Sequence, residues 1–354
     1  MCKKSIDVLF CNEGDVLAAD IYDKDGYTLL ITKDTVLNDY IKNSLMNHGV
    51  HTIDVYVAKT DSERASVADK YISAVNEAKN IFRTIITSGT VETQQLIDIA
   101  DHIHSHIDQS EEVIKCMSGV RSADEYTFIH SVNVAFYSMM LAKWLNLSAA
   151  EINDAILAGL LHDVGKMRIP GEILNKTAKL TADEFERMKK HTLYGYELVN
   201  NIKGLSEDIK NAVLLHHERM DGSGYPFGYQ SNKLNRYTRI VAIADVFDAM
   251  TAERVYKRQS TPFEAFGMFQ TEGTRIFDIG MLNTFMSRMP SYLTGIKVLL
   301  SNGEAGDIVF VPLQSVTNPI IKIKEDYIDL SSMQTVKIDK LMISFTKLDK
   351  LYKT

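Results

Sequence analysis

The hydrophobic pattern of the chain changes twice and separates three regions. Between residues 5 and 57, short segments of alternating apolar and polar residues, such as YTLLIT and HTIDVYV, predict strands around one short helix near Asp39 to His48. From about 62 to 289, apolar residues recur at spacings of three and four, which predicts a series of helices. After Pro290, segments such as GIKVLL and NPIIKIK again predict strands. We therefore expect a mainly α protein, with a helical bundle flanked by a small N-terminal α+β module and a small C-terminal β module.

This pattern divides the chain into four segments. Residues 1–60 form the N-terminal module, 61–120 a helical connector, 121–290 the main helical domain and 291–354 the C-terminal module. We expect a regulatory or structural role for the first segment and a packing or partner surface for the last. The connector could join two copies of the chain in a homodimer, although its apolar residues do not sustain clean heptads.

Composition narrows the class of protein. The chain has 354 residues, of which 45% are hydrophobic, which is enough for a sizeable core. The formal charge of -7 argues against a surface built to bind long nucleic acids, so we expect no DNA partner. Cys2, Cys11 and Cys116 lie far apart and give no support for a disulfide framework or a thiolate zinc site. With no signal-peptide core and no apolar run of roughly 18 residues, we expect a cytoplasmic location and no membrane insertion.

Charged residues interrupt two of the predicted apolar helices. His162 and Asp163 end the apolar segment GLL, and Asp245 lies within RIVAIADVFDAM. An unpaired buried carboxylate is unfavourable by several kcal/mol, roughly, unless it meets a cation or becomes neutral. Taken singly, each residue is more simply explained by a helix cap, a pair with Arg or a hydrogen bond to a carbonyl. The joint occurrence of several such residues favours a metal site.

The candidate metal ligands share nitrogen or oxygen donors and positions on predicted helices. They are His130, His162, Asp163, His191, His216, His217 and Asp245. Such donors suit divalent iron, manganese or zinc. Seven ligands are too many for one tetrahedral ion and suit two ions bridged by a carboxylate, and a helical bundle can direct them inward from several helices.

Five ordered motifs resemble those of a known family, the HD-GYP phosphodiesterases of the HD superfamily of metal-dependent phosphohydrolases. The motifs lie within about 120–260 and read YTFIHSVNVA, LLHDVGK, KHTLYGYELV, LLHHERMDGSGYP and IADVFDAMTAERVYK. The resemblance implies an HD-type helical bundle at 121–290 as the catalytic domain. It also implies hydrolysis of the bacterial second messenger cyclic di-GMP.

The resemblance also assigns roles to residues. One ion would be held by His130, His162, Asp163 and Asp245, and a second by His191, His216 and His217, with Asp163 bridging the two. Substrate contacts would fall on Lys166, Tyr225, Arg254 and Lys257. The implied catalytic residues are His162, Asp163 and Lys166, which would promote attack of a bridging hydroxide on phosphorus and give linear pGpG, with further cleavage to GMP open.

One position departs from part of the family. Members with three metals have a Glu four residues before the first motif histidine, where this chain has Tyr126. A phenol, with a pKa near ~10, is a poor ligand at neutral pH. We therefore expect two ions, iron or manganese.

Two alternatives stay open. The site could act on another cyclic dinucleotide or a nucleoside phosphate, because the same scaffold serves several substrates. The domain could instead be a non-catalytic cyclic-dinucleotide sensor or a module that docks to diguanylate cyclase domains through the loop that contains Tyr225. Retention of every ligand argues for chemistry.

Overall fold

The computed structural model describes residues 3–23, 25–56, 61–105, 113–114, 117, 126–252, 260–333 and 335–342. The chain forms two compact units. Unit 1 is made of Met1–Ser66 together with Phe285–Ser344, and unit 2 contains Val67–Thr284. The protein is mainly α with small sheets near both ends, as the hydrophobic pattern predicts.

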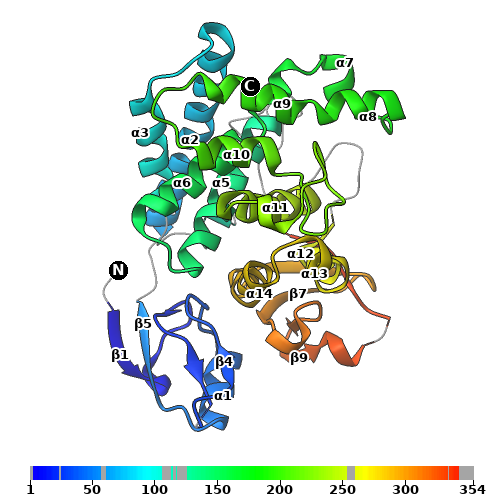
Figure 1. The fold of residues 1–354 in the computed structure, drawn as a ribbon. Helices are drawn as coiled ribbons and strands as arrows, with labels where there is room; N and C mark the ends of the chain where they lie inside the picture. The colour runs from blue at the N-terminus through cyan, green and yellow to red at the C-terminus, as the bar shows by residue number, and fades with distance from the viewer. Residues whose placement is uncertain are drawn as a thin grey trace. The chain divides into compact units, whose positions relative to one another are not determined.

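Unit 2 is helical, and α5 (Tyr126–Trp144) lies at its centre. Its helices besides α5 are α2 (Asp61–Ser88), α3 (Thr93–His104), α6 (Ala149–Leu161), α7 (Gly171–Leu174), α8 (Ala182–Lys189), α9 (His191–Asn200), α10 (Glu207–Leu215), α11 (Arg236–Thr251), α12 (Pro262–Met268), α13 (Thr274–Ile276) and the start of α14 (Ile279–Arg288). Short 3-10 segments η4 (Val164–Arg168) and η5 (Ser231–Lys233) and a π-helical turn η6 (Phe269–Gly273) connect some of them. Because α5 is apolar on all sides, it is buried along most of its length, against α6 and α11 (Figure 1).

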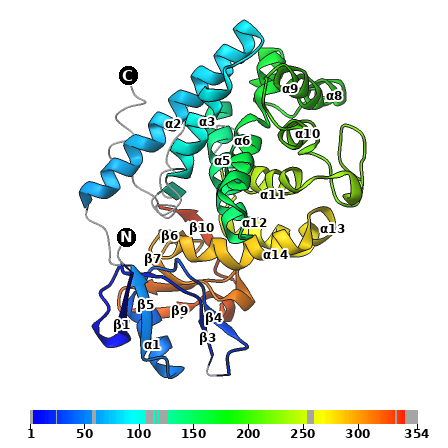
Figure 2. The same cartoon turned by 60° about the vertical axis from the view of Figure 1, so that its left-hand side comes forward.

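The long helix α2 packs on this centre along a single face. Its buried residues follow the spacing of three and four that an amphipathic helix requires: Val67, Ala68, Tyr71, Ala74, Val75, Ala78, Ile81, Phe82 and Ile85. Phe82 contacts Phe128 of α5 edge to face, with ring centroids 5.7 Å apart. Figure 2 shows α2 and α3 running beside α5 and α6.

Side-chain caps fix where several of these helices begin. Thr181 and Glu184 form a capping box at the start of α8. Ser148 with Glu151 forms the same arrangement before α6. Ser206 caps α10 with its side chain. These caps set the helix ends near which the site residues lie.

Among the described residues, unit 1 contains three antiparallel sheets, one of them a pair of short strands, and helix α1. In its N-terminal part, β1 (Lys3–Asp7), β5 (Thr52–Tyr56) and β2 (Val16–Leu17) form a sheet in the order β1-β5-β2, beside the pair β3 (Ile21–Tyr22) and β4 (Leu29–Ile31) and helix α1 (Asp39–Asn47). In its C-terminal part, β6 (Lys297–Leu300), β7 (Ala305–Phe310), β8 (Ile320–Ile323), β9 (Asp326–Asp329) and β10 (Ile338–Leu341) pair in the order β10-β6-β7-β8-β9. Short 3-10 segments are η1 (Val8–Phe10), η7 (Met289–Leu293), η8 (Leu313–Ser315) and η9 (Leu330–Ser332).

The two parts of unit 1 contact each other although they come from opposite ends of the chain. The Asn38 side-chain amide donates to the Val309 carbonyl at 2.7 Å. Tyr40 packs against Tyr327, with ring centroids 5.2 Å apart. Elsewhere the Arg288 guanidinium pairs with both oxygens of Asp20. The division of the chain into four segments stays a prediction, but its first and last segments share one unit.

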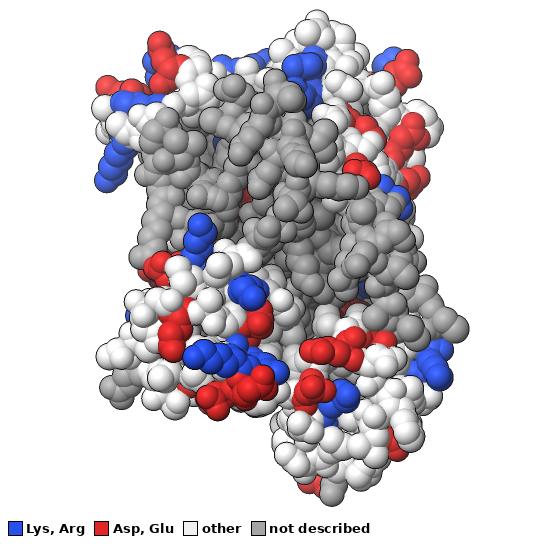
Figure 3. Space-filling model, turned by 180° about the vertical axis from the view of Figure 1, so that it is seen from behind, with Lys and Arg blue, Asp and Glu red and all other residues white. Residues whose placement is uncertain are grey.

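Two surface properties bear on partners. Among the helices that the structure describes, none combines the length and the apolarity needed to cross a bilayer. On the described part of the face seen in Figure 3, Lys and Arg side chains are interspersed with Asp and Glu. Mixed charges of this kind give that part of the face no field of a single sign.

Candidate metal centre

The seven predicted ligands come together in unit 2. They lie one turn into α5 (His130), directly after α6 (His162, Asp163), at the start of α9 (His191), directly after α10 (His216, His217) and within α11 (Asp245). All are buried except His217, which is half-buried. Their donor atoms fall into groups close enough to share an ion.

The first group consists of His130, His162 and Asp245. The Nε2 atom of His130 lies 3.1 Å from Oδ1 of Asp245, and Nε2 of His162 lies 3.8 Å from the same oxygen. One donor atom from each of the three residues lies within 4.8 Å of the others. Two imidazole nitrogens and a carboxylate oxygen are a usual donor set for divalent iron, manganese or zinc.

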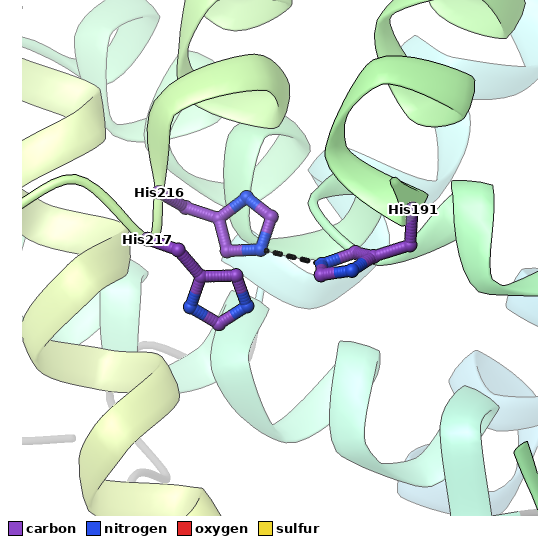
Figure 4. Close-up of side chains that lie close together, drawn as sticks. All are labelled: His191, His216 and His217. Carbon is purple, nitrogen blue, oxygen red and sulfur yellow. Dashed lines mark hydrogen bonds between the residues drawn. The ribbon is translucent and has the colours of Figure 1, made fainter. Parts of the chain in front are cut away.

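The second group consists of three histidines. Figure 4 shows their rings pointing toward one another, His191 from the start of α9 and His216 and His217 from the segment after α10. The Nε2 atoms of His191 and His216 lie 3.3 Å apart. A donor atom of His217 lies within 4.8 Å of both.

The Asp163 carboxylate faces both groups. Its Oδ2 atom lies 3.4 Å from Nε2 of His130 and 3.3 Å from Nε2 of His162. Its Oδ1 atom lies 3.4 Å from Nε2 of His191 and 3.9 Å from Nε2 of His216. Each oxygen thus points at one group, as a bridging carboxylate requires.

Helix ends orient three of the histidines. The Nδ1 atoms of His162, His191 and His216 lie 2.7, 2.8 and 2.9 Å from the carbonyl oxygens of the residues three positions earlier. A carbonyl only accepts, so Nδ1 carries the proton and donates it. These carbonyls belong to Gly159, Met188 and Val213, in the last turns of α6, α8 and α10. Each ring therefore presents a free Nε2 lone pair to the centre.

His130 is oriented differently, by a side chain that sequence reasoning missed. Its Nδ1 atom lies 2.7 Å from Oδ2 of Asp248, a buried carboxylate on α11. The other oxygen of Asp248 accepts a hydrogen bond from the Asn133 amide at 2.8 Å. The available signal was the spacing, since Asp248 follows Asp245 by three positions and so shares its helix face.

Burial keeps the histidines of the second group in the form that binds metal. Desolvation lowers the pKa of His191 to about 4, and the nearby Asp163 charge offsets only part of this effect. Desolvation and the neighbouring histidines also hold the pKa values of His216 and His217 well below the usual range. These three rings are neutral at physiological pH, which leaves a lone pair for a cation.

The carboxylates stay ionised despite their burial. Desolvation alone would raise the pKa of Asp163, but the charge of Lys166 and the contact with His162 outweigh it and hold this pKa well below its usual range. Asp245 behaves in the same way, because the hydrogen bond with His130 outweighs desolvation and holds its pKa well below the usual range. Desolvation lowers the pKa of His130. The neighbouring Asp245 and Asp248 outweigh this effect and raise the pKa of His130 to about 9. The centre therefore attracts positive charge.

Two buried atoms test whether a metal fits here. Within the described residues, Nε2 of His162 and Oδ1 of Asp163 have no hydrogen-bond partner. Leaving such atoms unpaired is unfavourable by roughly 1–3 kcal/mol each. Because both belong to the donor groups described above, a cation in the centre would satisfy them. The donor set fits divalent metal ions.

Three predicted substrate contacts, Lys166, Arg254 and Lys257, and Tyr126, which stands where part of the family has Glu, have different outcomes in the structure. Lys166 forms an ion pair with Oδ2 of Asp163. The Tyr126 ring stacks on the His130 ring, with centroids 5.8 Å apart and planes 5° apart. Arg254 and Lys257 lie outside the described residues.

The loop after α10 places Tyr225 beside the second group. Its ring centroid lies 4.6 Å from that of His217, and its backbone N–H donates to the His217 carbonyl at 3.2 Å. A side chain at Gly224 would put its Cβ 2.4 Å from the same carbonyl oxygen, so only glycine fits this approach. The Lys189 ammonium lies 5.7 Å from the centroid of the Tyr225 ring.

Glu218 holds this loop and was also missed from the sequence. Its buried carboxylate accepts backbone hydrogen bonds from Phe227 at 2.7 Å and Tyr229 at 3.0 Å. An acidic residue directly after two histidines carries no local signal for this role, because its partners lie nine and eleven positions later. Glu218 therefore holds the part of the loop that follows Tyr225.

Comparisons with known proteins show what the chain is similar to. The family model described as HD domain matches residues 94–280. The chain is 32% identical over 244 residues to a cyclic di-GMP phosphodiesterase of Pseudomonas aeruginosa, covering 69% of this chain and 59% of the relative. It is 41% identical over 140 residues to a cyclic di-GMP phosphodiesterase response regulator of Xanthomonas campestris pv. campestris, covering 39% of this chain and 37% of the relative.

A third relative is named for a different substrate. It is the 3'3'-cGAMP-specific phosphodiesterase 2 of Vibrio cholerae, 34% identical over 206 residues, covering 58% of this chain and 40% of the relative. The chain thus spans between 37% and 59% of the length of these three relatives.

Proposed function

The chain belongs to the HD domain family, and from this premise we propose that it is a metal-dependent phosphodiesterase that hydrolyses cyclic di-GMP. Two observations support the proposal. The buried histidines and aspartates form two donor groups, and the relatives from Pseudomonas and Xanthomonas carry this activity in their names. Within the family, the motifs of the chain resemble those of the HD-GYP branch.

The observation that carries the proposal is the position of Asp163. We propose that His130, His162 and Asp245 hold one ion, that His191, His216 and His217 hold the other, and that Asp163 bridges them. Two divalent ions, which we propose to be iron or manganese, would supply Lewis acidity and an activated water for an in-line displacement. Tyr126 offers no carboxylate, which favours two ions rather than three.

The chain's own residues would bind and orient the dinucleotide. Lys166, 21% exposed at its side chain, can turn from Asp163 toward a non-bridging phosphate oxygen. The Tyr225 ring lies where it can stack on a guanine, and Lys189 beside it adds positive charge. Arg254 and Lys257 are proposed to contact the distal phosphate.

In the proposed reaction, the oxygen of water bonds to phosphorus, and the bond from phosphorus to the 3′ oxygen breaks. The leaving oxygen takes up a proton, and the product is linear pGpG. Complete cleavage to GMP would require a second hydrolysis of the same kind. His162 and Asp163 would act through the positions of their donor atoms, and Lys166 through its charge on the phosphate.

A second substrate is favoured by one specific observation. The Vibrio relative is named for 3'3'-cGAMP, which differs from cyclic di-GMP in one base. Because Lys166, Arg254 and Lys257 are proposed to contact phosphate, selection between the two bases would depend on the Tyr225 loop. Docking to diguanylate cyclase domains through this loop, and pairing of two chains, are further proposals.

The test is hydrolysis by the full chain, purified without chelator and reconstituted with Fe(II) or Mn(II). Cyclic di-GMP and 3'3'-cGAMP are supplied separately and then in competition, and products are separated by chromatography. We expect pGpG from cyclic di-GMP and loss of at least about 100-fold in rate for the variant His162→Ala with Asp163→Ala.

Circular dichroism serves as the folding control for that variant. Unchanged helical content with lost hydrolysis would support the mechanism. Undiminished turnover would exclude the metal centre as the active site, and turnover of 3'3'-cGAMP alone would replace the proposed substrate.

A further inference from the structure

A chain of buried hydrogen bonds leads from α2 to the first group of donors. The Tyr71 hydroxyl lies 2.6 Å from Oδ1 of Asn133. The Asn133 amide nitrogen lies 2.8 Å from Oδ1 of Asp248, whose Oδ2 lies 2.7 Å from Nδ1 of His130. Tyr71, Asn133 and Asp248 are 1%, 3% and 2% exposed, so water does not compete for these bonds.

Chemistry fixes the direction of every bond in this network. An ionised carboxylate only accepts, so the Asn133 amide must turn its nitrogen to Asp248 and its oxygen to Tyr71. The Tyr71 hydroxyl therefore donates. The remaining oxygen of Asp248 accepts the proton on Nδ1 of His130, which leaves Nε2 as the basic nitrogen that faces Asp163 and Asp245.

The need for this network follows from the place of His130 in its helix. His162, His191 and His216 lie at helix ends, and their Nδ1 atoms use carbonyls from the last turn of the preceding helix. His130 lies inside α5, where the carbonyls are engaged in the helix. Among the described residues, the partner of its Nδ1 atom is instead a side chain from another helix. Asp248, one turn from Asp245 on α11, supplies it.

We propose that Asp248, Asn133 and Tyr71 are positioning residues of the metal centre, which fix the ring and tautomer of His130 and make its Nε2 atom a stronger donor. The inference rests on the metal centre of the proposed function but not on its substrate. Hydrogen-bonded carboxylates behind metal-bound histidines raise the basicity of the ligand, and their loss typically weakens metal binding 10–100-fold.

The network also ties the centre to α2. Tyr71 is its only member on that helix, and its ring packs against Phe136 of α5, with centroids 6.0 Å apart. Because the hydroxyl fixes the Asn133 amide, a shift of α2 would change the support of Asp248. We therefore expect Tyr71 to affect metal affinity through Asn133 and Asp248, which lie between its hydroxyl group and His130.

The alternative is that these residues only hold α2, α5 and α11 together. Metal binding by the metal-free protein separates the two roles, since it needs no cyclic dinucleotide. Protein stripped with chelator is titrated with Mn(II), and binding is followed by calorimetry and by electron paramagnetic resonance. For Asp248→Asn, which keeps the size of the side chain, we expect affinity for one ion to fall about 10–100-fold and the second ion to bind as before.

Tyr71→Phe is the milder variant, because it removes one hydroxyl and no ligand partner. We expect a fall of a few-fold, on the order of 3–10, in affinity for the same ion. Tyr237→Phe is its matched control, since Tyr237 is a buried tyrosine of unit 2 whose hydroxyl also binds a carboxylate, that of Asp154 at 3.1 Å. It should bind both ions like the parent protein.

The outcomes are distinct. Reduced affinity for one ion in Tyr71→Phe, with none in Tyr237→Phe, supports positioning. Parent-like binding of both ions by Asp248→Asn and Tyr71→Phe overturns it, and so do equal losses in the two tyrosine variants. If Asp248→Asn does not fold, Tyr71→Phe decides alone. A chain that binds two ions but cleaves no cyclic dinucleotide would contradict the proposed function and leave this inference standing.

Discussion

Among single residues, Asp163 is the one on which both donor groups depend. Each of its oxygens faces two histidine nitrogens at 3.3–3.9 Å, and the charge of Lys166 and the contact with His162 keep its pKa low enough for full ionisation. Asp245 faces the first group with Oδ1 and lies 3.7 Å from Nδ1 of His217 with Oδ2. Loss of either charge should therefore affect metal binding, but to different extents.

We expect Asp163→Asn to weaken binding of both ions by at least about 100-fold. This is the largest effect that is typical for loss of a residue that only supports a metal ligand. The amide has the same shape, but its nitrogen turns N–H groups toward one of the two donor groups. Metal content measured by elemental analysis checks this. Asp245→Asn is the comparison and should lose chiefly the ion of the first group. Two retained ions in Asp163→Asn would show that this residue does not bridge.

Residues of this kind could be predicted from the sequence only where several unusual features coincide. All seven ligands were predicted to lie together because charged residues in apolar helices need partners. Asp248 and Glu218 were missed, because an acidic residue near a helix end or loop is ordinary and only the fold shows their partners. Arg254 and Lys257, which lie outside the described residues, stay predictions.

At the scale of elements, the short segment η4 controls how α9 approaches α6. Gly165 lies in η4, and a Cβ atom there would be 2.0 Å from the His191 carbonyl oxygen and 2.4 Å from the Gly195 backbone nitrogen. Only a residue without a side chain allows this approach, which brings His191 close to Asp163. This close packing could not be predicted from the sequence, because local spacing does not identify the second helix that Gly165 meets.

We therefore expect Gly165→Ala to force α9 outward, to destabilise unit 2 by roughly 1–3 kcal/mol and to reduce occupancy of the second group. Thermal unfolding and metal content are the measurements. Gly171→Ala is the matched control, because a Cβ at Gly171 meets no atom within 4 Å. Equal stability and metal content of the two variants would contradict the packing argument.

For the whole molecule, the sequence did not predict that segments from both ends of the chain share unit 1. The alternating segments predicted strands at each end correctly, but no local pattern says that Asn38 meets Val309 or that Asp20 meets Arg288. Burial alone would raise the pKa of Asp20. The hydrogen bonds from Arg288 and from the Lys33 backbone outweigh burial and hold this pKa below its usual range.

A depressed carboxyl pKa makes stability depend on pH with a definite sign. The stabilisation is complete above the pKa of the unfolded chain, about 3.9, and is lost as pH falls through the lower pKa of the folded state. We expect Asp20→Asn to destabilise unit 1 by roughly 1–3 kcal/mol at pH 7, and the difference from the parent protein to shrink below about pH 4.

Hydrogen exchange of the peptides that contain β1 and β5 measures this change in unit 1 alone. Asp25→Asn is the control, because Asp25 is exposed and should leave exchange unchanged. A constant difference between Asp20→Asn and the parent protein from pH 7 to pH 3 would contradict the assignment of the ion pair.

The two-part construction of unit 1 has a consequence for how the protein is made. A ribosome that adds about 5–20 residues per second releases Met1–Ser66 on the order of tens of seconds before Phe285–Ser344. During that interval Val67–Thr284, with its complete set of metal donors, can fold and acquire ions. The N-terminal strands are made before β7 and β9, which carry the residues Phe310 and Tyr327 that pack against Tyr40. Translation thus delivers the metal-binding domain first and closes unit 1 last.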